Sequence, residues 1–183
     1  MRTLPNLLLA AFVLHGVAAG AADDLSVDVD RNGRSFSVRA EATLAVPVAT
    51  VWEVLTDYDH LARFIPGMSS SAVRLRAGSR VLVEQKGEAR FLVFSYPIDV
   101  HLEILESPHD SITSRRVGGN LRRMSGRYDL QSARGGLRLR YAGEFEPDFE
   151  LPPVIGTLAV RSMVEEQFVA MVAEIERRAA LRK

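Results

Sequence analysis

Two aspartates, Asp57 and Asp59, are the first candidates for a chemical role in this chain. They lie two positions apart. Two neighbouring carboxylates can share one proton and act as an acid and a base. Both aspartates also lie beside predicted helix ends, where short polar side chains bond free backbone N–H groups. We therefore interpret them as caps that fix the bend between two short helices.

The other candidate groups form no catalytic or metal-binding motif. His60, His101 and His109 show no H-x-x-x-H or HExxH spacing, so no metal site is predicted. The serines at 69–71 have no G-x-S-x-G pattern around them, and the chain contains neither cysteine nor a glycine-rich phosphate loop. The sequence therefore predicts no catalytic residue, no metal and no cofactor.

Arginine is concentrated between residues 115 and 140, where the only acidic residue is Asp129. Strand alternation turns several of these arginines outward, so we interpret them as a solvent-facing sheet surface paired with acidic neighbours. The alternative is a patch that meets anionic lipid head groups or a partner protein. A transient contact with a membrane surface therefore stays open.

Residues 1–21 are typical of a secretory signal peptide, because Arg2 precedes an apolar run from Leu7 to Leu14 and small residues follow. That run is too short to span a bilayer, which takes roughly 20 residues. We expect residues 22–183 to form one periplasmic or secreted domain, without a transmembrane helix or a lipid-modified cysteine. Loss of Arg2 turns 23 basic residues into 22 against 23 acidic ones, and this net charge of −1 argues against nucleic acid.

The elements that must position these residues are mostly strands. Alternating segments at 26–30 and 36–44 flank Asn32-Gly33, which is a strong hairpin signal. Short turns separate further segments of period two, which favours an antiparallel meander. These segments are 72–76, 80–86, 89–96, 98–106, 111–117, 121–131 and 136–146.

Two helical regions interrupt this pattern. The stretch 51–68 predicts a kinked pair of short helices, apolar on one side and stopped by Pro66-Gly67. One long helix is predicted from about Val154 to the end of the chain. Its inward stripe would contain Leu158, Val164, Phe168, Met171, Val172 and Ile175.

The last hairpin can be aligned by its side chains. A four-residue loop at 132–135 predicts Gly126 opposite Tyr141 on the inner face. The same register sets Asp129 opposite Arg138 on the outer face, which is a favourable charge pair. A central glycine would also let this strand bend strongly, as a sheet wrapped around a helix requires.

The order of strand, two short helices, antiparallel strands and long C-terminal helix resembles the START-like helix-grip fold of the SRPBCC superfamily. The stretch A-V-P-V-A-T-V-W-E-V-L-T-D-Y-D-H-L-A-R-F-I-P-G-M at 45–68 is similar to the opening signature of its polyketide cyclase/dehydrase and coenzyme-Q-binding branch. Further matches are G-E-A-R-F-L-V-F-S-Y-P at 87–97, M-S-G-R-Y-D-L at 124–130 and E-I-E-R-R at 174–178. The likeness covers roughly residues 36–180.

This resemblance implies an α+β fold in which a curved antiparallel sheet grips the C-terminal helix around an elongated apolar cavity. The kinked helices would lie at its mouth. Aromatic and methionine side chains of the inner surface are the candidates for lining or gating the cavity. They are Trp52, Tyr58, Phe64, Met68, Phe91, Met124, Tyr128, Tyr141, Met163, Phe168 and Met171. The methionines suit ligands of varied shape, or are ordinary core residues, and Trp52 could likewise be core packing.

The leading hypothesis is an exported START-like domain that binds a lipid, isoprenoid quinone or similar hydrophobic small molecule as a carrier or sequestering protein. A cyclase or dehydratase for an aromatic or polyketide-type substrate is the alternative, and it would need an acid or arginine beside Tyr128 or Tyr141. The third possibility is an envelope interaction module with a filled core and no cavity. The sequence leaves the ligand, its loading partners and the oligomeric state open.

Overall fold

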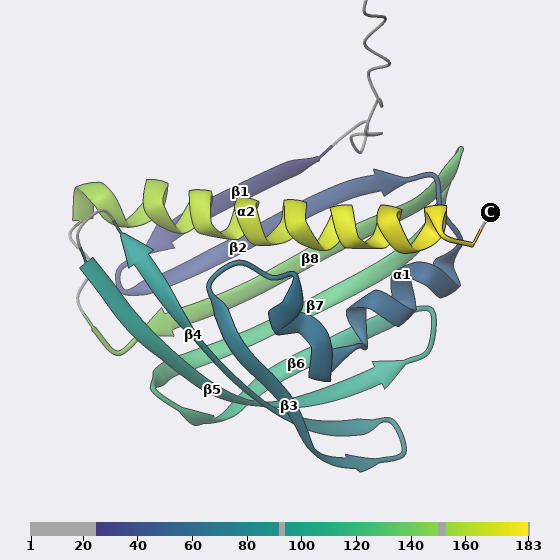
Figure 1. Cartoon of the computed structure of the whole chain (residues 1–183). Helices are drawn as coiled ribbons and strands as arrows, with labels where there is room; N and C mark the ends of the chain where they lie inside the picture. The colour runs from purple at the N-terminus through teal and green to yellow at the C-terminus, as the bar shows by residue number, and fades with distance from the viewer. Residues whose placement is uncertain (1–24, 92–93, 150–152, 183) are drawn as a thin grey trace, which may run out of the picture.

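The computed structural model describes residues 25–91, 94–149 and 153–182, which form a curved antiparallel sheet around a long helix (Figure 1). The strands are β1 (Ser26–Asn32), β2 (Ser35–Leu44), β3 (Met68–Ala77), β4 (Arg80–Phe91), β5 (Phe94–Ser107), β6 (Ser111–Gly119), β7 (Leu121–Ala133) and β8 (Gly136–Pro147). Helix α1 (Val48–Leu55) and the short 3₁₀ helix η1 (Tyr58–Arg63) follow β2, and α2 (Pro153–Ala180) follows β8. The expected α+β helix-grip fold is confirmed. The predicted signal peptide lies outside the described residues.

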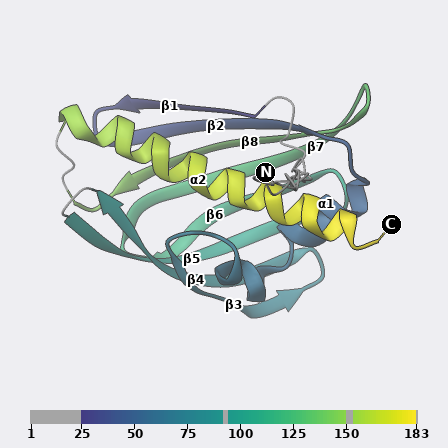
Figure 2. The same cartoon turned by 45° about the horizontal axis from the view of Figure 1, so that its top comes forward.

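The strands lie in the order β1-β2-β8-β7-β6-β5-β4-β3, so the last strand pairs with the N-terminal hairpin. This pairing leaves the longest connection, α1 and η1, to bridge from β2 to the opposite sheet edge at β3. Helix α2 crosses the concave side of the sheet, and α1 lies beside its C-terminal half (Figure 2). The sheet, α2 and the helix pair therefore enclose one interior space.

The division of the chain between residues 80 and 107 differs from the prediction. Lys86-Gly87-Glu88 and Tyr96-Pro97 are not turns, because β4 and β5 run through them. Two strands therefore stand where three were predicted, and the predicted strand 89–96 is divided between them. Gly87 serves a close approach instead, since a Cβ on it would lie 3.2 Å from the Met68 Cα. Strand β3 also begins at Met68, four residues before its predicted start.

The register of the last hairpin is shifted by two residues from the prediction. Tyr128 lies opposite Tyr141, and Gly126 lies opposite Gly143. The loop is a two-residue turn with Gly135 at a φ of +89°, where the sequence analysis placed four residues. A shift of two keeps every side chain on its predicted face, so the inner and outer surfaces are as expected.

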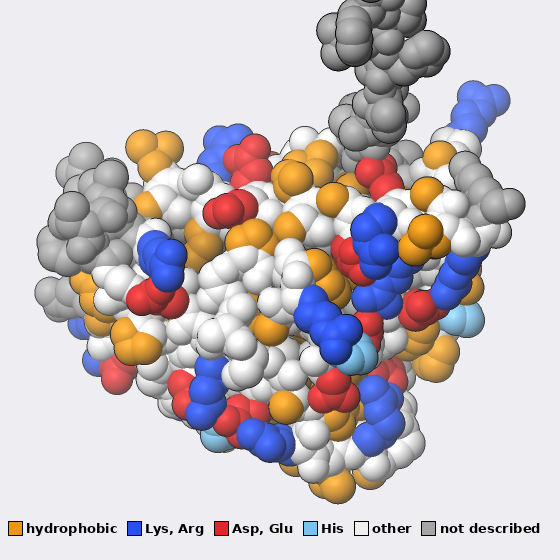
Figure 3. All heavy atoms as spheres, viewed as in Figure 1, with side chains coloured by type: hydrophobic (Ala, Val, Ile, Leu, Met, Phe, Trp, Pro, Cys, Tyr) orange, Lys and Arg blue, Asp and Glu red, His pale blue; other side chains and the backbone are white. Residues whose placement is uncertain are grey.

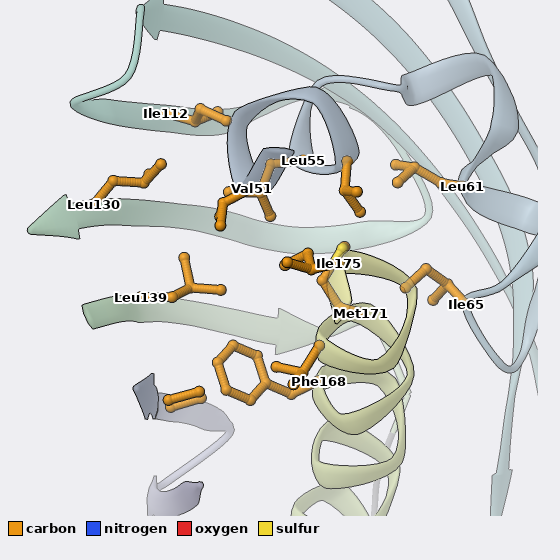
Figure 4. Packing of buried hydrophobic residues seen from close by; sticks show 14 of the residues in the cluster. Val51, Leu55, Leu61, Ile65, Ile112, Leu130, Leu139, Phe168, Met171 and Ile175 are labelled. Carbon is orange, nitrogen blue, oxygen red and sulfur yellow. The ribbon is translucent and has the colours of Figure 1, made fainter. Parts of the chain in front are cut away.

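Helix α2 packs through a stripe of Val160, Val164, Phe168, Met171 and Ile175, most of it buried. Figure 4 shows Phe168, Met171 and Ile175 facing Leu139 of β8 and the apolar side of α1. Leu158 was wrongly predicted to face inward: it is 73% exposed, because two residues turn a helix by about 200° away from Val160. None of the helices in the described ranges is long and apolar enough to cross a membrane.

The helix pair is bent as predicted, but its aspartates are not caps. Neither α1 nor η1 has a side-chain hydrogen bond at its N-cap residue. Asp57 accepts hydrogen bonds from His60 Nδ1 at 2.6 Å and from Arg178 Nη2 at 2.7 Å, while Asp59 accepts one from the backbone N–H of Val73. The aspartates therefore fasten the helix pair to α2 and β3.

Candidate ligand-binding site

A cavity of about 310 Å³ lies between the concave face of the sheet and α2. The helix pair closes one side of it with Leu55, Leu61 and Ile65. Leu61 and Ile65 reach toward Met171 on α2 (Figure 4). Pockets for small molecules usually measure about 300–1,000 Å³ and have mainly apolar walls, so this cavity suits a compact apolar ligand.

Most of the predicted lining residues do form the cavity wall. Eight of the eleven candidates line it: Tyr58, Met68, Met124, Tyr128, Tyr141, Met163, Phe168 and Met171. The side chain of Phe91 lies outside the described part of the chain. That any of these residues contacts a ligand stays a prediction.

Trp52 and Phe64 lie outside the cavity wall. Trp52 packs edge-on against the His109 ring, with 5.6 Å between ring centroids. Phe64 lies under the Arg178 guanidinium, 5.8 Å from its ring centre. Both aromatic side chains are used to anchor the helix pair to its surroundings.

The contribution of β4 and β5 to the wall was not predicted from the sequence. Gln85, Gly87 and Ala89 line the cavity from β4, and Val100 and Leu102 line it from β5. The signal was present, because the alternation of buried Val81 and Val83 continues in step through Gly87. The predicted turn at Gly87 hid this continuation.

The mouth of the cavity lies between the η1–β3 connection, β4 and α2. Gly67 and Lys86 line the cavity and are also exposed at the surface. Gln167 on α2 donates a hydrogen bond of 3.1 Å to the Pro66 carbonyl, which ties α2 to that connection. Hydrophobic side chains show between α2 and this segment in the space-filling view (Figure 3).

Two tyrosines provide polar atoms inside the cavity. The rings of Tyr128 on β7 and Tyr141 on β8 lie 4.7 Å apart. Burial raises the pKa of Tyr141 to about 12 and raises that of Tyr128 as well, to which the neighbouring Tyr141 adds. Both phenols are therefore neutral near pH 7 and able to donate a hydrogen bond.

A third tyrosine turns its hydroxyl away from the cavity space. The Tyr58 hydroxyl is buried and makes no hydrogen bond of good geometry. Burial raises the pKa of Tyr58, and the nearby Glu106 carboxylate raises it further. Glu106 itself is paired with Arg76 at 2.8 Å and does not line the cavity.

Charged side chains contribute little to the wall within the described ranges, where only Lys86 and Glu88 line it. Lys86 is 3.1 Å from Glu84 and 3.6 Å from Asp99. The hydroxyl of Ser95 and the Arg90 guanidinium bond to Glu88 and lower its pKa. Both charges are therefore balanced by neighbouring side chains at the protein surface.

Glu84, Asp99 and His101 lie together on the outer side of the sheet, with potential ligand atoms within 4.8 Å of one another. The Lys86 ammonium already neutralises the two carboxylates. An ammonium ion among carboxylates opposes a second cation by direct repulsion. We therefore describe this group as an ion-pair cluster.

The arginines of β6 to β8 are largely paired with acidic residues on the outer face. Arg115 lies 2.9 Å from Glu103, Arg127 lies 2.7 Å from Asp129, and Arg140 lies 2.8 Å from Glu41. These pairs support the interpretation as a solvent-facing surface. A contact with anionic lipids stays a prediction.

Comparison with known proteins agrees with this geometry. Residues 35–180 match the model of a family described as polyketide cyclase / dehydrase and lipid transport. The chain belongs to this family. A comparison of the sequence with curated proteins found no match.

Solved structures show that the family member shares its fold with START-like proteins. A STAR-related lipid transfer protein fragment from Xanthomonas axonopodis is 17% identical, with a TM-score of 0.66 over 86% of this chain and 97% of that one. The Zhui aromatase/cyclase from Streptomyces sp. R1128 is 18% identical, with a TM-score of 0.64 over 81% and 95%. A START superfamily protein from Mycobacterium smegmatis is 12% identical, with a TM-score of 0.61 over 80% and 99%.

Proposed function

We propose that this protein binds an apolar small molecule in the cavity beneath α2 and carries or sequesters it. The observation that carries this proposal is an interior space of about 310 Å³ whose wall is almost wholly apolar. Transfer of apolar ligand surface from water into such a space is favourable by roughly 25 cal/mol per Å². The methionines of the wall would let it adapt to the shape of the ligand.

The size of the cavity narrows the ligand class. At the lower end of the range for small-molecule sites, it suits a ring system or a single acyl or isoprenoid chain better than a lipid with two chains. An isoprenoid quinone is one such molecule. The helix pair and the η1–β3 connection would control entry, since the exposed lining residues lie there.

A cyclase or dehydratase is the second candidate, because the family description names both activities and lipid transport. Such an enzyme needs a general acid, a base or an arginine near the reacting atoms. Across the described residues no acid or arginine lines the cavity beside Tyr128 or Tyr141. The carrier is therefore the better supported proposal. A void of this size also speaks against an interaction module with a filled core.

Export belongs to the proposal as well. The sequence of residues 1–21 supports a cleaved signal peptide, and the chain has no cysteine for lipid attachment. A carrier in the periplasm or outside the cell would keep an apolar molecule out of water between membranes. Fractionation of the native host and N-terminal sequencing of the mature protein would test this part.

The test of ligand binding is native mass spectrometry and organic extraction of protein purified from its own cell envelope. A reproducible apolar molecule that co-purifies is the expected result. The matched variants are Val164→Phe and Val169→Phe on α2: Val164 lines the cavity, whereas Val169 is 46% exposed. The first should lose the molecule and the second should keep it. Protein that is empty in every preparation, or equal occupancy in both variants, would contradict the proposal.

A further inference from the structure

Two hydroxyl groups face the cavity without a hydrogen-bond partner in the described part of the chain. Among the described residues, neither Tyr128 nor Tyr141 makes a hydrogen bond through its hydroxyl, although both side chains line the cavity. Their oxygens remain accessible inside it, whereas the Tyr58 oxygen is fully covered. A buried hydroxyl without a partner is unfavourable, so these two groups are suited to a polar atom of the bound molecule.

The strand register brings the two tyrosine rings together, with 4.7 Å between their centroids. Tyr128 and Tyr141 are directly opposite each other on β7 and β8. Beside them lies the pair of Gly126 and Gly143, and the Tyr141 ring leans over both glycines. A Cβ on Gly126 would lie 2.7 Å from the Tyr141 hydroxyl oxygen, so only glycine leaves room for it there. The two glycines therefore leave room for the Tyr141 hydroxyl on the inner face of the sheet.

The charged groups around the cavity determine which kind of polar ligand atom the hydroxyls can bind. The charged lining residues within the described ranges, Lys86 and Glu88, have their charged groups paired with neighbours at the protein surface. An anionic group beside the tyrosines would have no cation to balance it, and burial of an unpaired charge is strongly unfavourable. A neutral oxygen that accepts hydrogen bonds meets no such cost.

We propose that Tyr128 and Tyr141 together bind a neutral carbonyl oxygen of an otherwise apolar ligand, as found in ketones, quinones and esters. This inference rests on the proposed function, because it assumes that the cavity binds a small molecule. It adds the chemical class of the ligand and the residues that select it. A pure hydrocarbon would leave both hydroxyls unpaired, and a carboxylate would be uncompensated.

The test uses three probes with one ring system: 2-acetylnaphthalene, 2-ethylnaphthalene and 2-naphthoate. Their Kd values are measured by fluorescence titration for the wild-type protein and for Tyr128→Phe and Tyr141→Phe. Each substitution should weaken binding of the ketone by about threefold to tenfold, the range of one hydrogen bond, and leave the hydrocarbon unchanged. The readout is the ratio of the two Kd values, because a general change in cavity shape affects both.

Tyr58→Phe is the matched control, since Tyr58 lines the same cavity but its hydroxyl does not reach the space. It should leave the Kd ratio unchanged. An unchanged ratio in both test variants, or tighter binding of 2-naphthoate than of the ketone, would overturn the carbonyl assignment and leave the apolar carrier standing. Failure of 2-ethylnaphthalene and the ketone alike to bind the wild-type protein would overturn the proposed function itself.

Discussion

Substitution of Arg178 by methionine should destabilise the protein by releasing the helix pair from α2. Arg178 donates hydrogen bonds of 2.7 Å to Asp57 and of 2.7 Å to Glu174. Methionine retains much of the length of the side chain and removes its charge. Asp57 would keep its bond to His60, and Glu174 would keep its bonds to Arg177.

The magnitude follows from the exposure of these groups. The side chains of Arg178, Asp57 and Glu174 are 17%, 23% and 10% exposed. Exposed ion pairs contribute about 0.2–1 kcal/mol, whereas removal of one partner of a fully buried pair costs about 3–5 kcal/mol. We expect a loss of about 2 kcal/mol at pH 7. That loss lowers Tm by about 4–8 °C in a domain of this size.

The pH dependence adds a second readout. Hydrogen bonds from Arg177 and Arg178 hold the pKa of Glu174 at about 2, below its ordinary 4.5. Burial alone would raise the pKa of Asp57, but bonds from Arg178 and His60 lower it. A carboxyl whose pKa is lower in the folded protein stabilises it above the unfolded pKa and loses this effect on acidification. The difference between wild type and Arg178→Met should therefore shrink as the pH falls from about 4.5 toward 2.

The assay is urea unfolding at several pH values, monitored by circular dichroism, with Arg177→Met as the control. Arg177 bonds only Glu174 among the acidic groups described here and is 59% exposed, so its loss should cost less than about 1 kcal/mol. Equal destabilisation by the two substitutions at pH 7, or a difference from wild type that does not change with pH, would refute the role given to Arg178.

Four further substitutions test the fold. Gly67→Ala should destabilise by about 1–2 kcal/mol in urea unfolding, because Gly67 has a φ of +75° and a Cβ there would lie 3.0 Å from the Glu88 carbonyl oxygen. Val160→Ala should cost about 2 kcal/mol in the same assay, since Val160 is 0% exposed. Leu158→Ala should change stability by less than about 0.5 kcal/mol, because Leu158 is exposed. Similar losses for the two variants would contradict the observed orientation of α2. Asn120→Ala should lower stability by about 1 kcal/mol, because it removes both side-chain hydrogen bonds that join the β6–β7 turn to β5. An unchanged midpoint for Asn120→Ala would show that these exposed bonds contribute nothing.

Local pattern alone predicted which face of the last two strands is buried. Alternation assigned Tyr128 and Tyr141 to the inner face, and both line the cavity. The same reasoning placed Met124 on that face, and helical spacing placed Phe168 and Met171 on the inner side of α2. These predictions succeed because the side-chain period of a strand or helix is fixed by backbone geometry.

Pairing between elements was predicted less well. The predicted register of the last hairpin is two residues out, since a shift of two preserves the faces and changes only the cross-strand partners. Gly87 was predicted to lie in a turn, although the glycine is needed where the chain passes close to Gly67 and Met68. A glycine in the sequence does not reveal which of these two uses it serves.

The sequence by itself determined the class of fold and the apolar character of the interior, because both follow from the period and order of its elements. Only the tertiary structure decided what the polar groups do. Asp57 was predicted to cap a helix, but it accepts a hydrogen bond from Arg178, which lies 121 residues later in the chain. The hydroxyls of Tyr128 and Tyr141 have no hydrogen-bond partner among the described residues, and no described charged side chain lines the cavity beside them. The partners of a polar side chain depend on distances between segments remote in sequence, and no local pattern specifies those distances.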